Sequence, residues 1–146
     1  MLERLVESLN GTRTLFNTTN DENNLDNRSD DKGIEPESVV LGTVNGTTYA
    51  FVGLERDSGI VVLDLSDPTA PTFVTYVTNR RFPTEPGDNF DCLPEDDEDN
   101  DENFNVCGDL GPEGLTFVPA GQSPTGKALL IVSNEVSSTT TIWQVE

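Results

Sequence analysis

Four glutamates occupy matching places in two similar stretches of the sequence, and carboxylates placed in this way can bind a metal ion. Glu113 follows Glu37 by 76 residues, and each of the two stands directly after a proline. Glu135 follows Glu55 by 80 residues. Carboxylate oxygens are preferred ligands of Ca²⁺, which takes about six to eight oxygen ligands. The four side chains are therefore the candidate metal ligands of this protein.

The glutamates lie in a repeated unit. The stretch "DKGIEPESVVLG" at residues 31–42 parallels "GDLGPEGLTFVP" at residues 108–119. The run "YAFVGLERDSGIVVLDL" aligns in the same way with "ALLIVSNEVSSTTTIWQV". A longer first hairpin in the second copy, "PAGQSPTGK" in place of "NG", accounts for the difference between the two offsets. The sequence therefore predicts two copies of one supersecondary unit.

The first copy has the pattern of four short strands joined by tight turns. Its apolar runs are "SVVLGTV", "TTYAFVGLE", "IVVLDL" and "TFVTYV", which begin at Ser38, Thr47, Ile60 and Thr72. Asn45-Gly46, between the first two runs, is the strongest short hairpin signal. This pattern predicts a four-stranded antiparallel meander. We expect the second copy to lack the fourth strand, since residue 146 directly follows "TTIWQV".

The apolar runs are nearly continuous, which is typical of strands in sheets that are covered on both faces. A repeated four-stranded meander of this length is the sequence signature of a β-propeller blade. The predicted fold class is all-β, with two antiparallel propeller-type blades, a short N-terminal helix and long acidic loops. Because a propeller ring needs at least about four blades, we expect either a fragment of a larger β-propeller or a chain that borrows strands from partners.

The composition divides the chain into four parts. We assign residues 1–32 to a short helix and a polar acidic loop, residues 33–78 to the first blade, residues 79–108 to an acidic insertion, and residues 109–146 to the final, incomplete blade. The helix is predicted from Leu2, Leu5, Val6 and Leu9, whose spacing places them on one face. The acidic run at residues 96–102 lacks the glycine and the terminal glutamate of a helix-loop-helix calcium loop. We interpret it as a solvated surface.

Acidic residues dominate the charge of the chain. It has 27 acidic and 8 basic residues, a formal net charge of −19 and no histidine. This charge argues against nucleic-acid or anionic-membrane partners. The lack of histidine excludes Ser-His-Asp and Cys-His nucleophile systems, as well as imidazole metal ligands, within this sequence.

The charge balance resembles that of proteins from salt-loving archaea. At molar salt the Debye length falls to about 3 Å, so repulsion between surface carboxylates no longer opposes folding. At low salt the same charge destabilises the compact state. An ordinary acidic secreted protein is the alternative interpretation.

Cys92 and Cys107 are the only cysteines. They predict a disulfide that closes the acidic insertion and contributes about 3 kcal/mol in the chain-entropy model, with two free thiols as the alternative. A disulfide would imply an oxidising compartment. The start of the sequence, "MLERLVESLNG", is not a signal peptide, and no apolar run approaches the roughly 20 residues of a membrane span. We expect an extracellular or cell-surface protein whose export signal lies upstream of this segment.

Two segments resemble the carboxyl-terminal part of choice-of-anchor I domain proteins. They run from Phe16 to Val77 and from Gly108 to Glu146, and the motifs "RSDDKG", "EPE", "GLER", "GDLGPEG" and "SPTGK" carry the resemblance together. The segment "GIVVLDLSDPTAPTFV" also looks like the LVIVD type of propeller repeat. The resemblance implies a secreted or surface-anchored β-propeller whose first blades precede this sequence.

The function favoured by these observations is recognition or scaffolding by an extracellular module that Ca²⁺ stabilises, without catalysis in this segment. Its expected partners are the remaining propeller blades or cell-surface components. In a propeller, Glu37 and Glu113 would open the innermost strands and point toward the central channel. Alternatively, each glutamate accepts hydrogen bonds from a neighbouring blade and only pins the ring. The alternative function is a metal-dependent phosphoesterase, like alkaline phosphatase, with its site in the full-length propeller channel.

Overall fold

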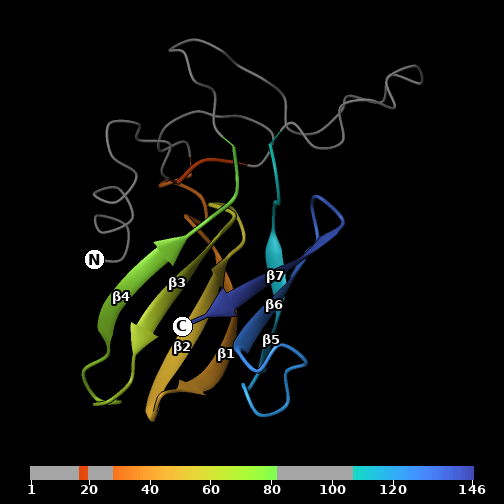
Figure 1. Cartoon of the computed structure of the whole chain (residues 1–146). Helices are drawn as coiled ribbons and strands as arrows, with labels where there is room; N and C mark the ends of the chain where they lie inside the picture. Colours follow the sequence, from red (N-terminus) through yellow and green to blue (C-terminus); the bar gives the residue numbers. More distant parts are fainter. Residues whose placement is uncertain (1–16, 20–27, 82–106) are drawn as a thin grey trace.

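The described part of the chain consists of β-strands and their connections (Figure 1). The structure is a computed structural model that describes residues 17–19, 28–81 and 107–146. The predicted N-terminal helix, Cys92 and the acidic run at residues 96–102 lie outside the described residues. Within the described ranges, no helix has the length and apolar character needed to cross a membrane. The all-β fold class predicted from the sequence is confirmed.

The first sheet is the predicted four-stranded meander. Its strands are β1 (Pro36–Val44), β2 (Thr47–Leu54), β3 (Gly59–Asp64) and β4 (Thr72–Val77), in the order β1-β2-β3-β4 with every pair antiparallel. The β1–β2 hairpin turns through Asn45 and Gly46, whose φ angles are 51° and 87°. A two-residue turn of this kind requires a positive φ at both residues, which asparagine and glycine tolerate best.

The second sheet repeats the first three strands. It contains β5 (Pro112–Val118), β6 (Ala128–Asn134) and β7 (Thr139–Val145), in the order β5-β6-β7. Ser58 before β3 and Ser138 before β7 have φ angles of 56° and 54°, so the corresponding turns of the two copies share a backbone conformation. Among the described residues no strand pairs with the outer edge of β7, as expected from the sequence.

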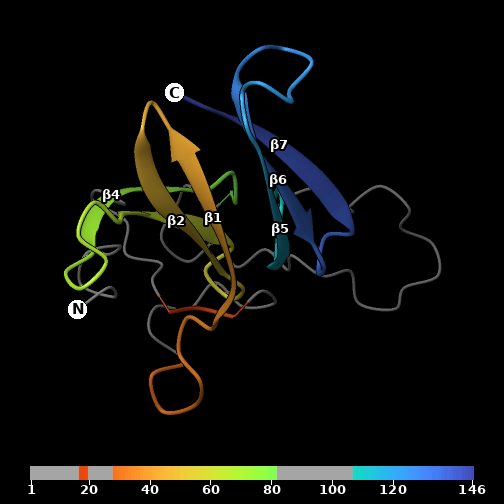
Figure 2. The same cartoon turned by 90° about the horizontal axis from the view of Figure 1, so that it is seen from below.

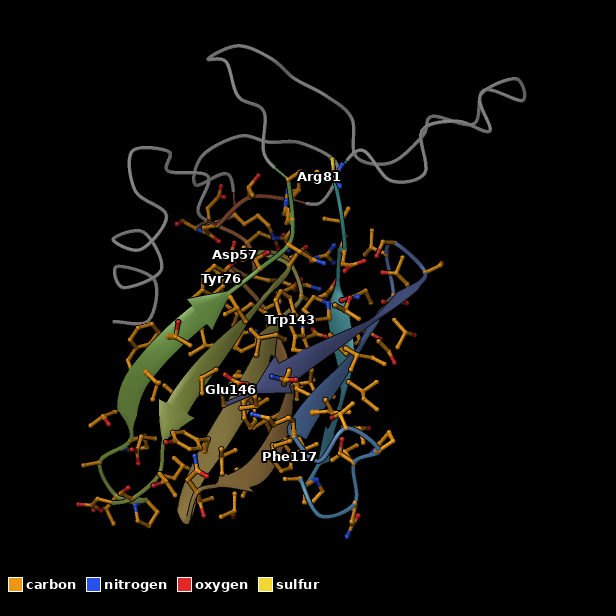
Figure 3. The ribbon with its side chains drawn as sticks, viewed as in Figure 1. Asp57, Tyr76, Arg81, Phe117, Trp143 and Glu146 are labelled. Atoms are coloured by element: carbon orange, nitrogen blue, oxygen red, sulfur yellow. The ribbon has the colours of Figure 1, made fainter. Side chains whose placement is uncertain are left out.

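The two sheets pack face to face, with β1 beside β5 (Figure 2). Phe51 of β2 stacks on Phe117 of β5, and their ring centroids are 5.6 Å apart. Gly42 of β1 makes this contact possible, because a Cβ atom on Gly42 would lie 2.4 Å from the Phe117 ring. Trp143 of β7 lies in the same interface as Phe117 (Figure 3). This interface is the larger of the two apolar clusters.

The opposite face of the first sheet carries a second apolar cluster. Its buried members are Ile34, Leu54 and Val61, and its half-buried members include Phe73 and Tyr76. Tyr76 and Asp57 lie together at one end of this face (Figure 3), where the Tyr76 hydroxyl donates to the Asp57 carbonyl at 3.3 Å. The first sheet therefore has apolar residues on both faces, which explains its nearly continuous apolar runs.

A methyl group added at Gly42 tests the packing between the sheets. We expect Gly42→Ala to lower the free energy of unfolding by about 1–3 kcal/mol, as overpacking of a filled core does, because the Phe117 ring must move. Chemical denaturation measures this change. Gly121→Ala is the matched control, since nothing lies within 4 Å of a Cβ atom at Gly121. Equal stabilities of the two variants would contradict the packing described.

Candidate cation-binding site

Strand pairing brings the four predicted glutamates to one end of the two sheets. Pro36 pairs with Leu54 in the first sheet, so Glu37 near the start of β1 lies close to Glu55, which follows β2. Pro112 pairs with Asn134 in the second sheet, which places Glu113 beside Glu135 in the same way. The beginnings of β1 and β5 lie at the same end of the sheets (Figure 1). The two pairs therefore form one acidic cluster.

A β-bulge places the first glutamate of each pair. The register between β1 and β2 shifts between Pro36 and Ser38, and the register between β5 and β6 shifts between Pro112 and Gly114. Glu37 and Glu113 lie at these shifts. Bulges turn a side chain away from its regular direction and are common next to functional sites. The repeat thus conserves the local backbone irregularity as well as the glutamate.

A direct hydrogen bond joins the beginnings of β1 and β5. The Ser38 hydroxyl donates to the Pro112 carbonyl at 3.0 Å. Gly53 of β2 permits this approach, because a Cβ atom there would lie 2.3 Å from Ser38 Oγ and 2.6 Å from the Pro112 carbonyl oxygen. The spacing between Glu37 and Glu113 is therefore set by a contact of their neighbours.

A fifth glutamate, Glu35, completes the cluster. Ligand oxygens of Glu35, Glu37 and Glu55 all lie within 4.8 Å of one another. Glu35 is buried, with 5% of its side chain exposed, whereas Glu37 is exposed. Three carboxylates at this separation can coordinate one cation together.

The sequence prediction missed Glu35 because its counterpart in the second copy is Gly111. Both residues have a positive φ, 49° for Glu35 and 75° for Gly111. Their carbonyls accept equivalent backbone hydrogen bonds at 2.8 Å, from Glu55 and Glu135 respectively. A glutamate with positive φ is strained, and such residues gather at functional sites. The alignment of Glu35 with a glycine, Gly111, in the second copy was the sequence signal that could have revealed Glu35.

Basic side chains surround Glu35. Arg56 Nε lies 2.5 Å from the Glu35 carboxylate, Lys32 Nζ 3.3 Å and Arg28 Nη2 3.5 Å. Burial alone would raise the pKa of Glu35, but its hydrogen bonds with Arg56 and Lys32 outweigh burial and lower this pKa. Arg56 also contacts Glu55, at 3.2 Å. This half of the cluster is therefore compensated by positive charge.

Carboxylates of the cluster also repel one another. Burial is the largest cause that raises the pKa of Glu55; the charge of Arg56 opposes it, and neighbouring glutamates add to it. A hydrogen bond with Glu135 is the largest cause that raises the pKa of Glu113, followed by the charge of Glu135. Glu55 and Glu37 of the first sheet also raise the pKa of Glu113, so the two sheets interact electrostatically here.

A divalent cation between the sheets would have glutamates of both repeats beside it. Glu37 and Glu55 would supply oxygens from the first sheet, and Glu113 and Glu135 from the second. Glu37, Glu113 and Glu135 are exposed, so a cation can enter from solvent. An opposite charge favours the ionised form of each carboxylate, and a bound cation would therefore lower the pKa values that the cluster raises.

The comparisons with known proteins bear on the first sheet. Residues 1–68 match the family model of the choice-of-anchor I domain. This part of the chain is similar to that family. The choice-of-anchor I match includes Glu35, Glu37 and Glu55, whereas Glu113, Glu135 and the second sheet lie beyond it. Neither a curated protein nor a solved structure matched the chain.

The second cysteine of the predicted disulfide, Cys107, is buried just before the second sheet. Its predicted partner, Cys92, lies outside the described residues. The Cys107 carbonyl accepts a hydrogen bond from the Arg81 backbone N–H at 2.7 Å. The chain segments on either side of the acidic insertion therefore meet, and the disulfide stays a prediction.

Replacing Glu113 by glutamine tests whether the carboxylates of the acidic cluster repel one another. The pKa of Glu113 is raised above its unfolded value of about 4.5. A glutamate of this kind stabilises the fold at pH values below the unfolded pKa. This stabilisation is lost as the pH rises through the raised folded-state pKa. We expect Glu113→Gln to melt at a higher temperature than the unmodified protein at about pH 7 in EDTA, because it removes one charge and keeps a hydrogen-bonding group. The difference should vanish at about pH 4.

The control for this measurement is Glu146→Gln. Glu146 is exposed and pairs with Lys127 at 3.1 Å, so its neutralisation removes an attraction and should not raise the melting temperature. Thermal melts followed by circular dichroism at both pH values give the comparison. A lower melting temperature for Glu113→Gln at neutral pH would contradict the assigned repulsion.

Proposed function

We propose that this chain is an extracellular or cell-surface β-propeller-type module for recognition or scaffolding, stabilised by Ca²⁺ at its acidic cluster. The observation that carries the proposal is the convergence of Glu37, Glu55, Glu113 and Glu135 from two repeats at one end of the sheet pair. The raised pKa values of Glu55 and Glu113 support it. Burial is the largest cause of the raised pKa of Glu55, and a hydrogen bond with Glu135 is the largest cause for Glu113; repulsion from neighbouring carboxylates adds to both, and a divalent cation would relieve that repulsion.

The cation would act as a cross-link between the sheets. The Glu37–Glu55 pair belongs to the first sheet and the Glu113–Glu135 pair to the second, so one ion that contacts both pairs would fasten the two repeats. Ligands that bind only the folded state stabilise it by mass action. A surface formed by both sheets would then keep a fixed geometry for its partner.

The cellular setting of the proposal has two supports. The match of residues 1–68 to a choice-of-anchor domain supports a cell-surface location. The net charge of −19 suits a solution rich in cations, because such solutions screen repulsion between carboxylates. A Cys92–Cys107 disulfide would fit the same oxidising environment. The expected partners are further propeller blades and other cell-surface components.

Calcium should raise the melting temperature of the chain at neutral pH. At a free Ca²⁺ concentration of about 100 times Kd, mass action predicts a gain of about 2.7 kcal/mol in the free energy of unfolding. The double variant Glu37→Gln/Glu113→Gln should lose this response because each pair loses one ligand. Melts with and without Ca²⁺, at ionic strength matched with NaCl, measure the effect.

Glu146→Gln is again the control, and it should respond to Ca²⁺ as the unmodified protein does. The calcium site would be refuted by an unmodified protein that does not respond, or by a double variant that responds equally. The same variants address the alternative function. Hydrolysis of a phosphate ester that disappears in the double variant would favour a metal-dependent phosphoesterase.

A further inference from the structure

The sequence contains four acceptor motifs for N-linked glycans, at Asn10, Asn17, Asn27 and Asn45. Such a motif is an asparagine followed by any residue except proline and then by serine or threonine. Asn10 and Asn27 lie outside the described residues. The structure describes the other two asparagines, and their surroundings differ.

Asn17 is buried, with 0% of its surface exposed. Its side-chain Nδ2 donates to Ser29 Oγ at 2.7 Å, and its backbone N–H donates to Asp57 Oδ1 at 3.0 Å. Thr18, the middle residue of the motif, is also fully buried. A glycan is bulky and occupies a surface position. A sugar attached to Asn17 Nδ2 would therefore require this packed region to open.

Asn45 lies at the tip of the β1–β2 hairpin (Figure 2) and is exposed. Thr47, the third residue of its motif, is the first residue of β2. An open depression of about 270 Å³ borders the turn, and Asn45, Lys127 and Glu146 are among the residues that line it. The hairpin tip therefore has room for a first sugar.

The position of the Asn45-Gly46 turn keeps it exposed even where further sheets stack on the two described ones. Propeller sheets stack through their faces, which are formed by side chains along the strands. A turn lies at the strand ends, and connecting segments run over the protein surface. A neighbouring sheet would therefore cover the strands and leave this turn outside the stack.

The turn is also distant from the acidic cluster. Asn45 follows Glu37 by eight positions along β1 and the turn after it, which corresponds to about 26 Å of extended strand. A glycan on Asn45 would thus be attached at the end of the sheet opposite to the glutamates. The proposed calcium site would stay accessible to solvent.

We propose that Asn45 is an acceptor for an N-linked glycan and that Asn17 is not an acceptor in the folded protein. The donor would be an oligosaccharide linked to a lipid through phosphate. Asn45 Nδ2 would form a bond with the anomeric carbon of the first sugar and give up one proton. The bond from that carbon to the phosphate oxygen would break, and the lipid phosphate would leave. The proposal rests on the extracellular or cell-surface location proposed above, because this transfer accompanies export.

Export of the full chain from a cell that glycosylates its secreted proteins tests the acceptor. An export signal is added before Met1. Trypsin then releases residues 33–56, in which Asn45 is the only asparagine. Mass spectrometry should find this peptide with the mass of a glycan added. The intact glycopeptide is measured because asparagine before glycine also loses ammonia spontaneously, which would imitate the aspartate left by enzymatic removal of a glycan.

The same sample reports on Asn17. Circular dichroism first establishes that the secreted protein is folded. Trypsin together with a protease that cleaves before aspartate releases residues 14–20, in which Asn17 is the only motif asparagine. This peptide should carry no glycan, because the folded protein buries the Asn17 side chain.

Thr47→Ser and Thr47→Val are a matched pair of variants. Both keep Asn45 and Gly46, but only serine retains the hydroxyl group that the motif requires. Valine is a β-branched residue and suits the first position of a strand. Thr47→Ser should keep the glycan on Asn45, and Thr47→Val should lose it. A modification that persists in Thr47→Val would overturn the assignment, since it would not be an N-linked glycan of this motif.

A folded, secreted protein without a glycan on Asn45 would overturn the proposal, and so would a glycan on Asn17. If the chain is retained in the cell, residues 33–56 of the retained protein are measured, because the glycan is added during export. Since the export signal is added in this experiment, a negative result would leave the proposed cellular location unaffected. The melts with Ca²⁺ test the proposed function separately.

Discussion

The packing of the two sheets through Phe51 and Phe117 is the contact on which the rest of the structure depends. It requires Gly42 on the neighbouring strand, since any larger side chain there would meet the Phe117 ring. Once these sheets are in contact, β1 lies beside β5 and their starting residues face each other. The bond from Ser38 to the Pro112 carbonyl then fixes the spacing at that end.

The packing of the two sheets brings the glutamates of the acidic cluster together. Each sheet by itself would carry one pair of glutamates, and the stacking of sheets sums them into one cluster. Among the described residues, Arg28, Lys32 and Arg56 compensate Glu35, and Arg56 also pairs with Glu55. Apolar burial is strong enough to hold like charges together. A region that stores such repulsion is suited to bind a cation, and the stacking of the sheets thereby prepares the proposed calcium site.

Most of the fold could be predicted from the sequence because its signals are local. Asn45-Gly46 determined the first hairpin, and the apolar runs determined the strands and their number. The repeat offsets identified Glu37, Glu55, Glu113 and Glu135 as equivalent positions. Glu35 escaped because its neighbour in the repeat is Gly111, and what the two share is a backbone conformation. The grouping of Arg28 and Arg56 around Glu35 also escaped, since residues far apart in the chain meet there only after folding.

The sequence by itself determined an all-β chain with two copies of one meander and a strong negative charge. These properties follow from the periodicity of side chains, from turn residues and from composition, which act over short distances along the chain. Only the tertiary structure decided which face of each sheet is buried and which carboxylates lie close together. Those outcomes depend on contacts between distant segments, where a single pair such as Gly42 and Phe117 sets the distance at which two sheets meet.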